Sequence, residues 1–189
     1  MSSIPEKKFV REPAKRVLAR EFRDIKYEVK EGTDEKAPKF ALLPTGEKAN
    51  RVFVVGVLLE KEKRGDAKPF YRMKIQDPTG SIYGMASSYK PDAMQAIAEI
   101  EAPAFVAVVG KANPYETPEG NVYVSLGAEF VSVVDKETRN LYLLDAMKAT
   151  LDRIEHRTSL PDYALISEKY GDISMIPYLE AVRESGASL

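Results

Sequence analysis

The sequence of 189 residues contains no cysteine and no tryptophan. The lack of cysteine excludes disulfide bonds and thiolate zinc sites. No apolar run reaches the roughly 18 residues that a membrane-spanning helix needs, and the polar, lysine-bearing start from Met1 to Val10 does not read as a secretory signal. We therefore expect a cytoplasmic protein with no membrane partner.

Residues that could carry catalysis are also scarce. The only histidine, His156, lies at the expected end of a helix, where a cation interacts favourably with the helix dipole. The sequence offers no glycine-rich phosphate loop, no nucleophile elbow and no evident acid–base pair. We expect a protein that is not an enzyme and that holds no cofactor and no metal.

The net charge of −1 argues against a general polyanion binder, but the charges are unevenly distributed. Between Lys7 and Arg20 there are six basic residues and one acid, and between Lys61 and Lys74 there are six basic residues and two acids. The part that begins at Asp135 is acidic, with ten acids and seven bases. Two basic zones thus precede an acidic C-terminal third.

The sequence of the N-terminal part predicts one short helix and two strands. Pro13 suits a first helical position, and the apolar residues that follow have helical spacing, which predicts an amphipathic helix over 13–24. The stripe consists of Ala14, Val17, Leu18 and Phe22. Two short strands are expected at 25–31 and 38–43 around a polar loop.

The centre of the chain is rich in strand signals. Val52 to Leu59 is almost wholly apolar, and Gly56 in its middle indicates a bend. A charged loop is expected from Glu60 to Lys68. Alternating strands follow at 70–76 and 82–87, joined by the turn Asp77-Pro78-Thr79-Gly80.

A helix that begins at Pro91 follows, and then two more strands, at 104–109 and 122–134, around an expected loop at 111–120. The expected order is three strands, of which the first is long, then a helix and then two strands. This is the order of the OB-fold. We predict an all-β core, a five-stranded OB-fold barrel, with an N-terminal helix and strand extension and C-terminal helices. A generic mixed α+β domain is the alternative.

A long helix is expected after the barrel. Leu144, Met147, Leu151 and Ile154 are spaced three, four and three residues apart, which predicts a helix over 136–156 with one apolar seam. Shorter helices are expected at 162–170 and 176–185. The predicted organisation is a basic extension (1–48), the OB-fold domain (49–135), an assembly helix (136–157) and a helical tail (158–189).

Several stretches resemble the archaeal replication protein A-associated proteins, which are OB-fold partners of a larger replication protein A subunit. The stretches are RVLAREF, LLPTGEKANRVFVVGVL, IQDPTG, VAVVGK and YETPEGN. The resemblance covers Arg11 to Asp135, and the tail matches only loosely. It implies an accessory subunit that binds single-stranded DNA in replication and repair, at the nucleoid. The absence of a cysteine zinc module, which some large subunits carry, fits an accessory role.

Single-strand binding by an OB-fold needs cations for phosphates and aromatic rings for bases, across the second and third strands and the flanking loops. On this chain the expected DNA-binding residues are Lys61, Lys63, Arg64, Lys68, Arg72, Lys74, Tyr83, Lys111, Tyr115 and Tyr123. These residues also have purely structural interpretations. The lysine run would be a solvated loop, Tyr83 and Tyr123 would cover the core edge or meet a partner, and Tyr115 would pack its own loop.

The seam of Leu144, Met147, Leu151 and Ile154 is the strongest interaction signal. The resemblance implies that it binds the larger replication protein A subunit in a hetero-oligomer, because a helix after each OB-fold bundles with its partners in those complexes. The structural alternative is that the seam packs within its own chain. The alternative function is an assembly subunit with little direct DNA contact, which the near-neutral net charge favours.

Overall fold

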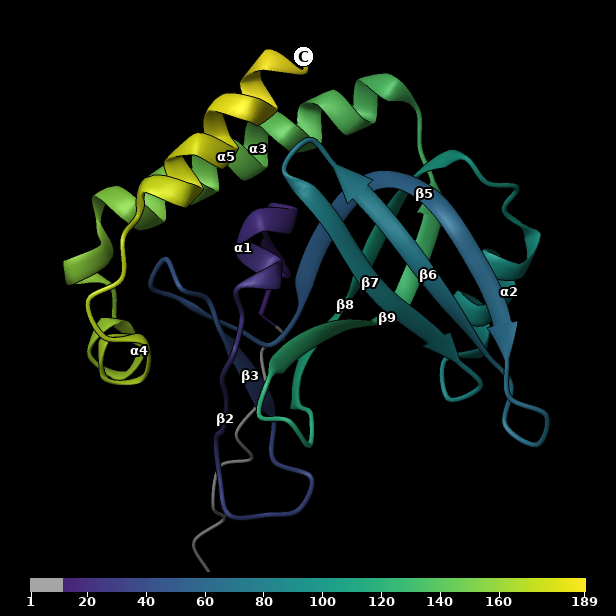
Figure 1. Cartoon of the computed structure of the whole chain (residues 1–189), viewed down its shortest axis with the longest axis horizontal. Coiled ribbons are helices and arrows are strands. Elements are labelled where there is room, and N and C mark those ends of the chain that lie inside the picture. Colours follow the sequence, from purple (N-terminus) through teal and green to yellow (C-terminus); the bar gives the residue numbers. More distant parts are fainter. Residues whose placement is uncertain (1–11) are drawn as a thin grey trace, which may run out of the picture.

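Five strands form the centre of the molecule and close into a barrel (Figure 1). The computed structural model describes residues 12–189. The barrel strands are β5 (Val52–Arg64), β6 (Phe70–Asp77), β7 (Gly80–Ser87), β8 (Ala104–Glu116) and β9 (Val122–Val133). β5 pairs antiparallel with β6 and β8, β7 pairs with β6, and β9 joins β8 in antiparallel and β7 in parallel register. With α2 (Pro91–Glu99) between β7 and β8, the predicted OB-fold is confirmed.

The first barrel strand, β5, belongs to both sides of the barrel. Val57 and Leu58 have partners on both edges, in β6 and in β8. Gly56 comes directly before this point, and a Cβ there would lie 2.5 Å from the backbone oxygen of Gln76. The strands approach this closely only because residue 56 has no side chain.

The first parts of two expected loops, 60–68 and 111–120, are strands. β5 continues to Arg64, which pairs with Phe70, and β8 continues to Glu116, which pairs with Val122. Most side chains at these ends are exposed, and charged and polar residues stand there in place of the apolar alternation that marks a strand. Pro114 is tolerated in β8 because, past Gly110, that strand no longer pairs with β5 and forms an edge.

The N-terminal helix is shorter than the apolar stripe predicted. Lys15–Arg16 forms the strand β1, parallel to β5, and only Ala19–Arg23 is helical, as α1. The expected helix over 13–24 was therefore wrong in its first half, because that half completes a sheet edge. A separate small sheet contains β2 (Glu28–Lys30), β3 (Lys39–Leu42) and β4 (Lys48–Ala49), close to the strands expected there.

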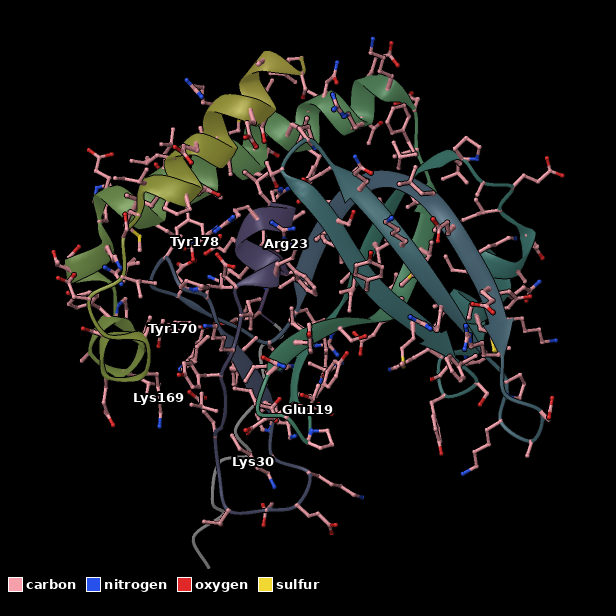
Figure 2. The ribbon with its side chains drawn as sticks, in the orientation of Figure 1. Arg23, Lys30, Glu119, Lys169, Tyr170 and Tyr178 are labelled. Carbon is pink, nitrogen blue, oxygen red and sulfur yellow. The ribbon has the colours of Figure 1, made fainter. Side chains whose placement is uncertain are left out.

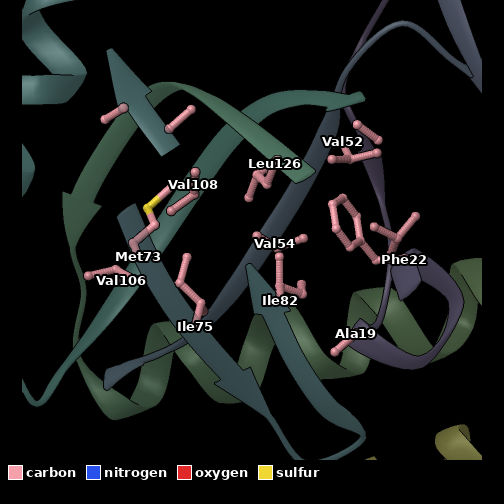
Figure 3. Close-up of a cluster of buried hydrophobic side chains, with 14 of the residues drawn as sticks. Ala19, Phe22, Val52, Val54, Met73, Ile75, Ile82, Val106, Val108 and Leu126 are labelled. Atoms are coloured by element: carbon pink, nitrogen blue, oxygen red, sulfur yellow. The ribbon is translucent and has the colours of Figure 1, made fainter. Parts of the chain in front are cut away.

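The N-terminal segment closes one end of the barrel core. Phe22 and Ile25 are fully buried among barrel residues such as Val52 and Leu126. Figure 3 shows the ring of Phe22 beside these side chains. The turn between β6 and β7 secures the helix, because the Asp77 carboxylate accepts a bond from the Ala19 amide at 2.7 Å. Burial raises the pKa of Asp77, although this bond and those from Thr79 oppose the shift.

Helices cover the outer side of β5 and β8. α3 (Lys136–Glu155) is followed by a 3₁₀ turn (Arg157–Ser159), α4 (Tyr163–Tyr170) and α5 (Ile176–Ala187). The Asp135 carboxylate accepts from the Thr138 amide at 2.7 Å and caps α3. Hydrogen bonding to the Thr138 side chain, and then to its amide, lowers the pKa of Asp135. No helix within residues 12–189, α3 included, is long and apolar enough to cross a membrane.

Two tyrosines of the tail fasten it to the N-terminal part. Figure 2 shows Tyr170 and Tyr178 reaching from α4 and α5 toward the segments around α1 and β2. The Tyr170 hydroxyl donates to the Leu42 carbonyl at 2.7 Å, and the Tyr178 hydroxyl donates to Asp24 at 3.0 Å. The first and last segments of the described chain thus stabilise each other.

A buried ion pair connects α1 to α3. Arg153 and Glu21 are 4% and 1% exposed, and the Arg153 guanidinium bonds the Glu21 carboxylate at 2.7 Å. Arg153 also donates to the Thr45 hydroxyl at 2.7 Å and to the carbonyl oxygen of Arg16. Thr45 in turn donates to Glu21. Three segments far apart in sequence therefore share one buried polar network.

Replacing Arg153 with methionine should lower the free energy of unfolding by about 3–5 kcal/mol, because the change leaves the Glu21 carboxylate buried without a cation. Urea unfolding measures the loss. The double variant Glu21→Gln with Arg153→Met should recover part of it, since the two effects are coupled. Asp152→Asn, at the exposed neighbouring position, is the matched control. An Arg153→Met protein as stable as the control would refute the role of the pair.

Candidate nucleic-acid interface

The outer face of the barrel carries a row of directly paired residues across all five strands. Directly paired residues of neighbouring strands point to the same face of a sheet. Following the register from β5 through β6, β7 and β9 to β8 gives the row Glu62, Arg72, Met85, Gly127 and Lys111. Strands distant in sequence thus bring two predicted cations onto one surface.

The aromatic residues lie in the next two rows. On the β5–β6–β7 side Glu60 pairs with Lys74 and Lys74 with Tyr83. On the β8–β9 side Asn113 pairs with Ser125. One step further along β8 and β9, Tyr115 pairs with Tyr123, and their ring centroids lie 6.1 Å apart.

A hollow of about 500 Å³ opens between these strands. Its lining is Arg72, Met73, Tyr83, Gly84, Met85, Asn113, Pro114, Tyr115, Val124 and Ser125. The walls are thus largely apolar or aromatic, with a cation among them. Such a lining suits a flat ring bound by its faces, with a charged group beside it.

The three tyrosines of this face are unusually open to solvent. Tyr83, Tyr115 and Tyr123 are each more than half exposed. The Lys74 ammonium lies 5.9 Å from the centroid of the Tyr83 ring. Exposed rings beside cations offer stacking surfaces and phosphate contacts together.

Two predicted cations, Lys61 and Lys63, point away from this face. An extra residue interrupts the β5–β6 register between Leu58 and Glu60, so Lys61 pairs with the core residue Met73 and Lys63 with Tyr71. The Lys61 ammonium donates to the carbonyl oxygens of Ile97 and Ala98, at 2.9 and 2.7 Å, and so caps the C-terminal end of α2. Their expected place in a loop was wrong, because both lysines lie in β5 on the opposite face of the sheet.

The bulge brings acidic residues onto the outer face in their place. Glu60 lies 4.0 Å from the Lys74 ammonium, and Glu62 lies 2.8 Å from the Arg64 guanidinium. No residue within 12–189 forms an ion pair with Arg72 or Lys111. Two cations of the face are therefore balanced locally by carboxylates.

The search of solved structures gave matches to the barrel with helices. One chain of the S. pombe Stn1–Ten1 complex aligns with a TM-score of 0.54 at 12% identity, over 84% of this chain and 100% of that one. This likeness agrees with the OB-fold that the strand order of the described chain shows.

Smaller portions align with other proteins. One is the second single-stranded DNA-binding protein of Mycobacterium smegmatis, with a TM-score of 0.38 at 15% identity over 44% of this chain and 84% of that one. Another is the mitochondrial single-stranded DNA-binding protein Rim1 of S. cerevisiae, with a TM-score of 0.37 at 18% identity over 45% of this chain and 92% of that one. No protein-family model matches the sequence, and the search of curated proteins found no similar sequence.

Sequence reasoning missed five residues of this OB-fold surface. They are Glu60, Glu62, Met85, Asn113 and Ser125. The last three each lie two positions from a predicted tyrosine, so strand alternation alone could have indicated them. The remaining predicted cation, Lys68, lies in the exposed turn between β5 and β6. Within the described chain, no group of three or more histidines and acids is placed to hold a metal.

The predicted seam on α3 lies at the edge of the face that packs on the barrel. The buried residues of this helix include Tyr142, Leu143 and Ala146. Leu144 and Leu151 are 49% and 42% exposed. Met147 and Ile154 are partly covered. The exposed Leu141 of α3 and Leu179 of α5 add apolar surface to the two helices.

Proposed function

We propose that this chain binds single-stranded DNA as an accessory subunit of an archaeal replication protein A complex, and that it acts by binding and not by catalysis. The observation that carries the proposal is the outer face of the OB-fold barrel, where two exposed tyrosines and the cation of Arg72 border one hollow. Rings of this kind stack on unpaired bases, at about 1–3 kcal/mol per base. In a duplex those base faces are covered by neighbouring bases, so single strands are the ligand that fits.

The small net charge of the outer barrel face favours a modest affinity for single-stranded DNA. Four cations, Arg64, Arg72, Lys74 and Lys111, share the surface with the carboxylates of Glu60 and Glu62. Their small net positive charge attracts phosphates weakly, and salt screens the attraction. A weak binding module gains effective affinity when it is joined to other modules in one complex.

The proposed complex rests on the sequence stretches that resemble archaeal replication protein A-associated proteins and on the half-exposed seam of α3. The chain with the same fold in S. pombe also belongs to a complex of two proteins. Leu144, Met147, Leu151 and Ile154 would contact helices of the larger subunit, and the complex would act on DNA at the nucleoid in replication and repair.

A second candidate is an assembly subunit that binds other subunits with little direct DNA contact. The carboxylates of Glu60 and Glu62 on the outer face favour it, as does the net charge of −1. A salt titration of DNA binding by the isolated chain separates the two functions, because phosphate contacts weaken steeply as salt rises.

Replacing Arg72 and Tyr83 together with alanine should weaken binding of a labelled single strand and leave the barrel folded, because both side chains lie on the outer face. The lost stack alone corresponds to about 1–3 kcal/mol, and the slope of log affinity against log salt should fall by about 0.7 for the lost phosphate contact. Fluorescence anisotropy measures both. Lys63→Ala, on the opposite face of the same hairpin, is the matched control. Equal losses in the two proteins would show that the interface is misplaced.

Removing the negative charges should have the reverse effect. The variant Glu60→Gln with Glu62→Gln should bind single strands more tightly at low salt, since it frees Lys74 and Arg64 for phosphates. The gain should shrink at high salt, where the charges are screened. Glu101→Gln, an exposed acid outside this face, is the control. Unchanged or weaker binding by the double variant would speak for the assembly function.

The partner surface has its own test. Changing Met147 and Leu151 to aspartate should release the subunit from its complex, because two charges cannot be buried in an apolar interface without a large cost. Co-purification after co-expression with the larger subunit measures release, and circular dichroism checks that the barrel stays folded. Asp152→Lys changes a charge of α3 outside the seam, and this variant should still co-purify with the complex. Retention of the double aspartate variant at parental stoichiometry would contradict the proposed seam.

A further inference from the structure

The hollow of the proposed interface has a polar side formed by β8 and β9. Asn113 and Ser125 are register partners there and both line the hollow. The surfaces around them are the side chains of Tyr83, Met85 and Tyr115. A ring held by these apolar groups would present one edge to an amide and a hydroxyl.

The amide of Asn113 is held in place by the backbone. Its nitrogen donates to the carbonyl oxygen of Lys111 at 3.3 Å. The amide occupies the space that the missing side chain of Gly127 leaves, because a Cβ on Gly127 would lie 2.9 Å from the Asn113 nitrogen. One N–H of this amide is engaged and the nitrogen faces Lys111 and Gly127, so the side-chain oxygen is the atom that we expect to accept a hydrogen bond from a ligand.

The ligand edge that fits an acceptor is one that carries a donor. Cytosine and adenine have an exocyclic amino group, whereas thymine and guanine have a carbonyl oxygen at the corresponding position. An acceptor facing that oxygen would be left unpaired, which disfavours binding. The Ser125 hydroxyl donates or accepts, so it does not discriminate. Arg72 belongs to the row with Glu62 and Lys111, where it suits a phosphate.

We propose that this hollow binds one unstacked base and that the Asn113 oxygen reads its edge, so that cytosine and adenine, which carry an amino group at that position, are preferred over thymine and guanine, which carry a carbonyl oxygen there. This inference rests on the proposed single-strand binding and goes beyond it, since stacking alone accepts every base. Asn113 is then the residue that determines base preference, while the tyrosines and cations supply affinity common to all sequences.

Homopolymers of deoxycytidine and thymidine test the preference, because the two pyrimidines are alike in size and differ at the amino or carbonyl group. Labelled strands of equal length are titrated with the full chain at about pH 8, where cytosine is unprotonated. The parent should bind the cytidine strand about 5- to 150-fold more tightly, the range expected for one discriminating base contact. Asn113→Leu should bring the ratio of the two affinities close to one.

Two further variants complete the test. Asn113→Asp keeps an acceptor but loses the donor to the Lys111 carbonyl, so it should retain only part of the cytidine preference, and its charge lowers both affinities. Asn121→Leu, in the exposed turn between β8 and β9, should retain the parental ratio.

Each outcome bears on the inference. A parent that binds both strands equally, with steep salt dependence, would overturn the base-reading site while the proposed function stands. A preference that survives in Asn113→Leu would also overturn it. A parent that binds neither strand would overturn both proposals.

Discussion

A single bulge in β5 decides which side chains face the candidate interface. Because side chains alternate along a strand, an extra residue between Leu58 and the paired Glu60 moves every later side chain to the opposite face. Without it, the register would pair Lys61 with Arg72. With it, Lys61 caps α2 and Glu60 and Glu62 join the outer face. The electrostatic character of the surface therefore depends on this local register.

The bulge shifts the proposed binding from charge toward stacking. A face on which carboxylates neutralise half of the cations attracts phosphates weakly, so the exposed tyrosines must provide much of the binding free energy. Stacking does not depend on charge and does not by itself select a sequence. A low intrinsic affinity is consistent with a subunit that acts beside others, and the half-exposed α3 seam is the surface proposed to join them.

Much of the fold could be predicted from the sequence because local patterns and the fold agree. The order of strands, the turn at Asp77–Gly80 and the helix that begins at Pro91 carry signals within a few residues. The extended ends of β5 and β8 were missed because their mostly exposed charged and polar residues give no apolar alternation. The true extent of α1 was missed because pairing of β1 with β5 overrides helical spacing.

The candidate site also has residues that could be predicted from the sequence and residues that could not. Arg72, Lys74, Tyr83 and the tyrosines of β8 and β9 could be placed on one face by alternation, once the barrel was assumed. The exclusion of Lys61 and Lys63 could not be predicted, because the position of a bulge depends on the tertiary register. The same holds for the buried pair of Glu21 and Arg153, which lie far apart in sequence and give no local signal.

Backbone amide chemical shifts, recorded while a single-stranded oligonucleotide is added, test the central claim most directly. The largest changes should fall on β6, β7 and the β8–β9 hairpin, around Arg72, Tyr83 and Tyr115, and the amides of α2 near Lys61 should stay unchanged. Changes confined to α2, α3 or α5, or no changes at concentrations that saturate OB-fold binding modules, would contradict the assignment of this face as the DNA-binding surface.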